Sequence, residues 1–425
     1  MKIIVQKYGG SSLATAEKIK KVAQKIAVLC RRRKGTSLVI VVSAMGGTTD
    51  KLINLANAVG KSRDGGESYP VNRILSGGRD GRELDNLLST GERVSSSLLA
   101  LALNSLGQSA ISLSGGEAGI ITDKVYTKAK IYSLDTDRIK KELKKGKIVI
   151  VAGFQGVSDE GEVTTLGRGA SDLSAVALAK ALDAERCEIF SDVKGIYTAD
   201  PSAVDGVKKI SQISYDEVLA MAGCGAGVMQ GRAIELAKKS GIPLSIRSTF
   251  VKGKGTTIGS LPTKFAGKFV EAPSVTNVAL NEKEAKVSIF RVADRPGIAS
   301  RVFAPIAQGG INVDMIVQNV SKDGYTDLSF TVFDEDLQKT VKITRKVAKE
   351  IGAGKVSFDD DIARVSIIGL GMTSHPGVAA KMFSVLAKNK INIKMITTSE
   401  IKICAIVRRK DGNRALKVVH KEFIN

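Results

Sequence analysis

The sequence predicts an α/β protein with a mostly parallel central sheet, followed by two small domains of the βαββαβ type. Over roughly the first 250 residues, short apolar strands alternate with helices, and several strands end in Gly-rich loops. A linker-like stretch, KGKGTTIGSLP, begins at Lys252. Beyond it, the order strand, Pro-Gly turn, helix and strand occurs twice, first from Val287 and again from Val365.

The composition limits the possible functions. A chain of 425 residues is long enough for two or three domains. No apolar run can cross a bilayer, and the N-terminal MKIIVQKYGG is predicted to be a strand entering a glycine turn rather than a signal peptide. Four scattered cysteines lack metal-ligand spacing, as expected for a reduced, cytoplasmic protein. The net charge of +21 is spread over amphipathic helices and aromatic residues make up only 4%, which favours a solvated basic surface over a nucleic-acid interface.

Two strand–loop–helix units open the chain. An apolar strand at 2–6 leads into KYGGSS (7–12) and a helix over about 14–32, and a buried strand at 38–42 leads into SAMGGTTD (43–50) and a second helix. Ligands of open α/β sheets bind at the carboxyl ends of strands, so we expect these two loops to share one site. Lys7 beside paired glycines can neutralise a phosphate, although the Walker pattern GK[ST] is absent.

The next segments complete the α/β half. Residues 60–83 contain six glycines and little periodicity, which predicts a surface insertion. A helix over 84–103 carries Glu92 beside Gly91, where a ligand amine can approach; a solvated glutamate is the alternative. The remaining strands are expected at 111–114, 148–152, 187–191 and 244–248, with helices at 213–221 and 232–239.

Residues 164–182, TTLGRGASDLSAVALAKAL, indicate an anion site. Arg168 lies between two glycines, and Ser171 and Asp172 follow at the expected start of a helix. The free N–H groups and the positive end of the helix dipole suit an anion. The planar fork of Arg168 fits a carboxylate or a phosphate. By itself this stretch is equally consistent with a capped core helix that carries a surface arginine.

The two C-terminal repeats differ in completeness. The first continues through a strand at 327–332, a helix at 337–351 and a strand at 356–359, which completes βαββαβ. The second ends in a helix at 413–423 and lacks a fourth strand. We predict that residues 274–281 supply that strand, so that the two copies interlock.

Together these blocks resemble aspartate kinases of the amino-acid kinase superfamily, which carry two C-terminal ACT domains. The matching blocks are KYGGSS (7–12), VSAMGGTTD (42–50), LLSTGE (87–92), TTLGRGASD (164–172), SDVKGIYTADP (191–201) and both repeats. The resemblance implies an amino-acid kinase fold followed by two ferredoxin-like ACT domains. It implies a catalytic domain at 1–250, a linker with a joining strand at 251–285, and ACT domains at 286–361 and 362–425.

The resemblance also implies an activity, the ATP-dependent phosphorylation of the side-chain carboxylate of L-aspartate to 4-phospho-L-aspartate. This reaction begins lysine, threonine, methionine and diaminopimelate biosynthesis. ATP is expected with Mg²⁺, which is held mainly through the nucleotide, so no residue is assigned as a metal ligand. The acceptor carboxylate is already a nucleophile, and the reaction needs positioning and positive charge rather than a general base. We expect a homodimer or larger oligomer formed through ACT domains, with no nucleic acid or membrane partner.

The family's motifs imply roles for the matching residues. The expected catalytic residues are Lys7 and Asp172. The nucleotide is expected to contact Lys7, Tyr8, Gly9, Gly10, Ser43, Ser191, Asp192, Tyr197 and Asp200. Aspartate is expected to contact Thr48, Glu92, Arg168 and Ser171. Lysine, threonine or both are the expected inhibitors, bound by Asp294, Gly297, Ile298, Asn312, Asp314, Gln318 and Asn319 in the first repeat and by His375, Gly377, Val378, Asn392, Thr398, Ser399 and Glu400 in the second.

The sequence departs from the family pattern at several positions. Ser202 stands where the family usually has arginine, Gly227 where it usually has lysine, and Ala170 where it usually has glycine; the insertion at 60–83 is extra. Loss of two phosphate-facing cations leaves open an amino-acid-binding regulatory protein with a weakened kinase domain. Another amino-acid kinase, acting on glutamate or a carbamoyl group, is a third interpretation, against which the ACT pair and the Thr-Gly-Glu block argue.

Overall fold

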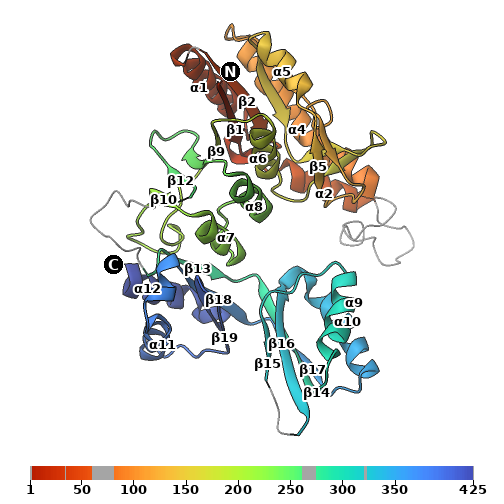
Figure 1. Ribbon diagram of the computed structural model, residues 1–425, viewed down its shortest axis with the longest axis vertical. Coiled ribbons are helices and arrows are strands. Elements are labelled where there is room, and N and C mark those ends of the chain that lie inside the picture. Colours follow the sequence, from red (N-terminus) through yellow and green to blue (C-terminus); the bar gives the residue numbers. More distant parts are fainter. Residues whose placement is uncertain (1, 34, 60–80, 261–273, 320–322, 425) are drawn as a thin grey trace. The chain divides into compact units, whose positions relative to one another are not determined.

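A computed structural model describes residues 2–33, 35–59, 81–260, 274–319 and 323–424 (Figure 1). The chain forms two compact units, which are described one at a time. The first unit comprises Met1–Ile196, Lys209–Leu219 and Gly227–Lys264; the second comprises Tyr197–Lys208, Ala220–Ala226 and Phe265–Asn425. The two short segments of the second unit lie within the range expected for the catalytic domain. None of the helices in the described ranges is long and apolar enough to cross a lipid bilayer.

The first unit is built on an eight-stranded sheet. Its strands follow the order β10-β12-β11-β9-β1-β2-β6-β3, and all neighbours are parallel except β11 and β12. The strands are β1 (Lys2–Tyr8), β2 (Thr36–Val42), β3 (Ala110–Leu113), β6 (Ile148–Ala152), β9 (Arg186–Ser191), β10 (Gln212–Ile213), β11 (Leu244–Ser248) and β12 (Thr256–Ile258). This topology confirms the predicted mostly parallel sheet.

Apolar packing against this sheet sets the positions of the helices. In α1, Val22 and Ile26 pack with Ile4 of β1 and Ile40 of β2, and all four are buried. The helix begins where the Thr15 side chain accepts the Lys18 N–H. The helices of this unit are α1 (Ala16–Arg32), α2 (Thr48–Val59), α4 (Gly81–Asn104), α5 (Asp137–Lys144), α6 (Ser171–Ala181), α7 (Tyr215–Gly223, whose last residues belong to the second unit) and α8 (Gly231–Ser240).

A second, smaller sheet in this unit was not predicted. It has the order β5-β4-β7-β8, formed by β4 (Ile120–Thr122), β5 (Ile131–Leu134), β7 (Gln155–Val157) and β8 (Val163–Thr165). Strands of three or four residues are too short to show a clear alternation in the sequence. A turn at residues 158–161 joins β7 and β8 as an antiparallel pair. Of the predicted insertion, residues 60–80 lie outside the described ranges, and α4 already begins at Gly81.

The second unit contains two four-stranded antiparallel sheets of the expected βαββαβ kind. The first has the order β15-β16-β14-β17 and the second the order β13-β18-β20-β19. The first domain comprises β14 (Glu284–Ala293), α9 (Ile298–Gln308), β15 (Ile316–Gln318), β16 (Tyr325–Phe333), α10 (Leu337–Glu350) and β17 (Val356–Asp359). The second comprises β13 (Asn277–Asn281), β18 (Ile362–Ile368), α11 (Val378–Lys388), β19 (Met395–Thr398), β20 (Lys402–Arg408) and α12 (Gly412–Ile424).

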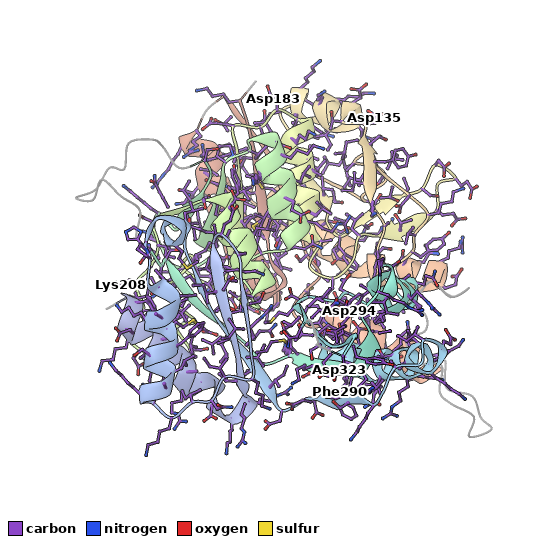
Figure 2. The ribbon with its side chains drawn as sticks, turned by 60° about the horizontal axis from the view of Figure 1, so that its bottom comes forward. Asp135, Asp183, Lys208, Phe290, Asp294 and Asp323 are labelled. Carbon is purple, nitrogen blue, oxygen red and sulfur yellow. The ribbon has the colours of Figure 1, made fainter. Side chains whose placement is uncertain are left out.

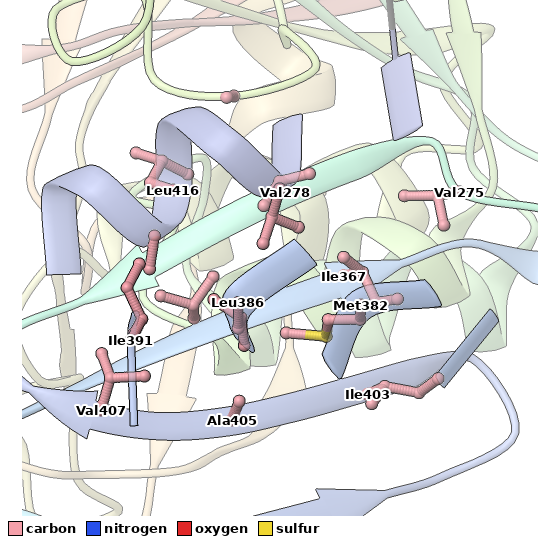
Figure 3. Close-up of a cluster of buried hydrophobic side chains, with 14 of the residues drawn as sticks. Val275, Val278, Ile367, Met382, Leu386, Ile391, Ile403, Ala405, Val407 and Leu416 are labelled. Carbon is pink, nitrogen blue, oxygen red and sulfur yellow. The ribbon is translucent and has the colours of Figure 1, made fainter. Parts of the chain in front are cut away.

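The fourth strand of the second domain comes from upstream, as predicted. β13 runs antiparallel to β18, with Asn277 opposite Ile368 and Asn281 opposite Arg364. Figure 3 shows Val278 of this strand in the same buried cluster as Ile367 and Leu416. The chain passes from β13 to β14 within three residues, so one continuous segment contributes a strand to each domain.

Candidate active site

Lys7 and Asp172 form an ion pair at the carboxyl end of the large sheet. Lys7 is near the end of β1, and Asp172 lies in the first turn of α6. The Lys7 Nζ is 2.7 Å from the Asp172 Oδ1, and the two side chains are only 12% and 11% exposed. A largely desolvated ammonium of this kind interacts strongly with a nearby anion because little water screens it. The structure therefore brings together both predicted catalytic residues.

The two glycine-containing loops meet beside this pair. The Gly46 N–H donates to the Gly10 carbonyl at 3.0 Å, and the Ser43 N–H donates to the Tyr8 carbonyl at 3.1 Å. A Cβ at position 10 would lie 2.7 Å from the Ala44 carbonyl oxygen, so only glycine permits this approach. The close contact explains why the first loop requires glycine.

Glu92 presents an unsatisfied carboxylate oxygen. The side chain of this α4 residue is 3% exposed, and its Oε1 accepts the Ala44 N–H at 3.1 Å. Among the described residues, its Oε2 is buried without a hydrogen-bond partner. Burial raises the pKa of Glu92 to about 7, more than the Ala44 N–H lowers it. An oxygen in this state fits the ammonium group of a ligand, which supplies both a donor and a positive charge.

Arg168 is held by a residue that the sequence analysis did not select. Its guanidinium lies 2.5 Å from the Asp50 carboxylate in the first turn of α2, and the two side chains are 78% and 56% exposed. Gln230, just before α8, was also missed; its N–H lies 3.5 Å from the Asp172 Oδ2 and its Nε2 lies 3.4 Å from the Arg168 carbonyl. Asp50 closes the VSAMGGTTD block, which was the available signal, whereas no local pattern marked Gln230.

The other predicted aspartate-binding residues lie on the same loops and helix starts. Thr48 opens α2, where its hydroxyl donates to the Met45 carbonyl at 2.5 Å. Ser171 opens α6 and is 4% exposed.

The predicted nucleotide residues divide into three groups. Ser43 follows the end of β2 and Ser191 ends β9; both are half-buried, and Asp192 is exposed. The Tyr8 ring is 1% exposed and stacks on Phe190 with centroids 4.9 Å apart, so its side chain belongs to the core. Its nucleotide contact stays a prediction that falls to its backbone. Tyr197 and Asp200 belong to the second unit, where Asp200 accepts hydrogen bonds from Ser202; their nucleotide contacts stay a prediction.

The predicted effector residues lie mostly at the surface of the ACT domains. Gly297 and Gly377 have φ of 86° and 92° and precede α9 and α11, where a left-handed residue without a side chain leaves the helix N-terminus open. Ile298 and Val378 pack into the cores, so only their backbones remain available. The exposed members are Asp294 (labelled in Figure 2), Asn312, Asp314, Gln318, Asn319, Asn392, Thr398, Ser399 and Glu400. The His375 Nδ1 lies 2.6 Å from the Gly371 carbonyl.

Asp85 of α4 fixes the strand that leads to Arg168. Its fully buried carboxylate accepts the N–H groups of Thr127 and Thr165 and the Thr165 hydroxyl. Asp85→Ala leaves these donors buried and unpaired, so we expect the free energy of unfolding in urea to fall by about 3 kcal/mol or more. Glu83→Ala on the same helix, where the side chain is 70% exposed, is the control and should change stability by less than about 0.5 kcal/mol. Equal losses would contradict the structural role of Asp85.

Comparisons with known proteins agree with this geometry. Residues 2–248 match the amino acid kinase family, and residues 287–351 and 365–423 match ACT domains. The fold and site thus define a kinase of the amino-acid type that carries its own ACT pair.

The whole chain also aligns with individual proteins. It is 44% identical over 423 residues to the aspartate kinase of Pseudomonas fluorescens, covering 100% of this chain and 98% of that protein. It is 46% identical over 421 residues to the aspartokinase of Helicobacter pylori, covering 99% of each. The crystal structure of E. coli aspartokinase III with aspartate and ADP shares the fold, with a TM-score of 0.80, 24% identity and all of both chains covered. The chain belongs to the aspartokinase family and is an aspartate kinase.

Proposed function

We propose that this chain transfers the γ-phosphoryl group of ATP to the side-chain carboxylate of L-aspartate at the site around Lys7 and Asp172. A carboxylate oxygen of aspartate forms the new P–O bond, the bond between the γ-phosphorus and its bridging oxygen breaks, and ADP leaves. The observation that carries this proposal is the buried Lys7–Asp172 pair, which holds a desolvated ammonium at the carboxyl end of the sheet.

Each charged residue has a distinct part in this proposal. Lys7 stabilises the charge on the phosphoryl group in the transition state, and Asp172 orients the Lys7 ammonium through their ion pair. Arg168 binds the α-carboxylate of aspartate through its guanidinium fork, and Glu92 binds the ammonium through its unpaired Oε2. Thr48 and Ser171 add hydrogen bonds to the same substrate. Magnesium, held mainly through the nucleotide phosphates, supplies further positive charge.

Trapping of the acyl phosphate tests this proposal directly. The enzyme is incubated with ATP, magnesium, hydroxylamine and one amino acid, and hydroxamate is measured. We expect hydroxamate with L-aspartate and none with L-glutamate. The absence of hydroxamate with any amino acid, together with amino-acid binding by calorimetry, would instead indicate a regulatory protein that has lost kinase activity.

The affinity for aspartate should depend on pH through Glu92. Because burial raises the pKa of this carboxyl to about 7, the free enzyme holds it protonated below that pH. Only the carboxylate attracts the substrate ammonium, so kcat/KM for aspartate should rise with pH up to about 7 and then level off. Glu92→Gln should lower kcat/KM and remove this pH step; an unchanged pH profile in the variant would assign the step to another group.

We also propose that lysine, threonine or both bind at the ACT domains and inhibit the enzyme, and that the cytoplasmic protein is a homodimer or larger. Supporting features for pairing between chains are Ile316 and Ile396, which are 51% and 42% exposed on the edge strands β15 and β19. Light scattering should give a mass at least twice 45.0 kDa, and Ile316→Lys with Ile396→Lys should reduce it. A monomeric wild-type protein would contradict the oligomer proposal.

A further inference from the structure

Arg364 lies at the centre of a buried polar cluster in the second unit. This β18 residue is 1% exposed, and its guanidinium contacts three groups from separate segments. One terminal nitrogen lies 2.6 Å from the Glu284 Oε1 of β14, the other pairs with the Asp314 carboxylate, and the Gly223 carbonyl accepts a hydrogen bond at 2.6 Å. Arg364 thus joins both ACT domains and the end of α7 within one unit.

This cluster is incompletely satisfied. Among the described residues, the Arg364 Nε and the Glu284 Oε2 are buried without hydrogen-bond partners. Buried ion clusters contribute little net stability, because desolvation offsets most of their attraction. Asp314 is the member that a ligand can reach, since its side chain is 45% exposed.

The Gly223 contact leads along the chain to the catalytic residues. Ala220–Ala226 belong to the second unit, but the residues on both sides, Lys209–Leu219 and Gly227–Lys264, belong to the first. Gln230 follows only seven residues after Gly223, and it contacts the Asp172 carboxylate and the Arg168 carbonyl. A change in the hydrogen bonding of the Gly223 carbonyl can therefore reach Gln230 at the active site through the seven residues of chain that join them.

We infer that Arg364 is a positioning residue that transmits the occupation of the first ACT domain to the active site through the Gly223 carbonyl. This inference rests on the proposed effector role of Asp314. The ammonium of an amino-acid effector competes with Arg364 for the Asp314 carboxylate. The guanidinium then shifts toward Glu284 and the Gly223 carbonyl, which strengthens the hold on residues 220–226 and hence changes the placement of Gln230 beside Asp172.

Two arginine variants distinguish transmission of effector binding to the active site from a general loosening of the contact between the two ACT domains. Arg364→Gln removes the contact with Gly223. Arg409→Gln is the matched control, because Arg409 also joins the two ACT domains through Asp334 and the Glu284 carbonyl but has no described contact with residues 220–226. We expect Arg364→Gln to raise the half-inhibitory concentration of lysine or threonine about tenfold or more, within the usual range of allosteric coupling, and Arg409→Gln to change it less than about threefold. Without effector, the activity of both variants should stay within about twofold of the wild-type activity.

A second readout covers the case in which Arg364→Gln does not fold. The double variant Arg364→Gln/Glu284→Gln leaves no buried carboxylate unpaired, and Asp314→Asn keeps Arg364 in place but removes the carboxylate that pairs with it. In hydrogen exchange, effector should lower the exchange of residues 220–230 in the wild type, because a guanidinium released by Asp314 binds the Gly223 carbonyl more firmly. In the Arg364 variants the exchange of these residues should be higher than in the wild type, and effector should not lower it, while calorimetry still detects effector binding.

The outcomes distinguish this inference from the proposed activity. Inhibition of Arg364→Gln at wild-type effector concentrations would overturn the role of Arg364 and leave the kinase intact. Equal loss of inhibition in both arginine variants would also overturn it, because it would indicate loosening rather than transmission. A wild-type enzyme that neither amino acid inhibits would overturn it as well, whereas failure of the kinase itself appears separately as absence of hydroxamate.

Discussion

Lys7→Met should lower kcat about 100- to 1,000-fold, because a preorganised cation at the transferring phosphoryl group contributes on that scale. The Lys7 ammonium is paired with Asp172 at 2.7 Å and is largely shielded from water, so solvent does not take the place of its charge. The KM for aspartate should change much less, since Lys7 is assigned to the phosphoryl group rather than to the amino acid. Steady-state kinetics with hydroxamate detection measure both quantities.

Matched variants control for general effects on charge and folding. Lys2→Met lies on the same strand with an exposed side chain and should leave kcat unchanged. Asp172→Asn should lower kcat like Lys7→Met, because the ammonium loses its orienting charge. Asp183→Asn, just after the same helix and labelled in Figure 2, should not. Near-normal turnover in Lys7→Met would remove this residue from the catalytic site.

Arg168→Ala should raise the KM for aspartate about 10- to 100-fold, because a charge-assisted hydrogen bond to a carboxylate contributes about 1.5–3 kcal/mol. The guanidinium is exposed and is already paired with a carboxylate, that of Asp50, at 2.5 Å. The α-carboxylate of aspartate is the same chemical group as the Asp50 side chain, so the Arg168 guanidinium can bind it in the same way. The effect should fall mainly on KM rather than on kcat.

Asp50→Asn is the informative companion to this variant. It removes the carboxylate that competes for Arg168 and should leave the KM for aspartate equal to the wild-type value or slightly lower, since an exposed ion pair is worth only about 0.2–1 kcal/mol. In the Arg168→Ala background the Asp50 substitution should have no further effect. An unchanged KM in Arg168→Ala would refute the assignment of the α-carboxylate to this residue.

Local patterns were sufficient for much of this architecture. The apolar stretches of β1, β2 and β6 predicted a buried parallel sheet, since strands covered on both faces need continuous apolar sequence. The Pro-Gly turns and the period of the following helices predicted two repeats of the βαββαβ type, which the family resemblance identified as ACT domains. The missing fourth strand of the second copy was inferred by counting elements, and β13 occupies that place.

The candidate site was partly predictable for a related reason. Lys7 was expected just after a strand, Glu92 follows a glycine and Asp172 was expected at a helix start, each within a recognisable block, so their chemistry was predictable before their geometry was known. The ring of Tyr8 could not be placed in this way, because alternation along a strand does not reveal which face carries the core when both faces are buried.

The sequence by itself determined the order of elements, the two repeats and the charged residues at strand and helix ends, because these depend on contacts between near neighbours in the chain. Only the tertiary structure decided that Asp50 forms an ion pair with Arg168 and that residues 220–226 pack with the second unit. It also decided that Arg364 contacts Glu284, Asp314 and the Gly223 carbonyl. Arg364 and Gly223 are 141 residues apart. A contact of this kind depends on how separate elements pack, and no periodicity within either segment encodes it.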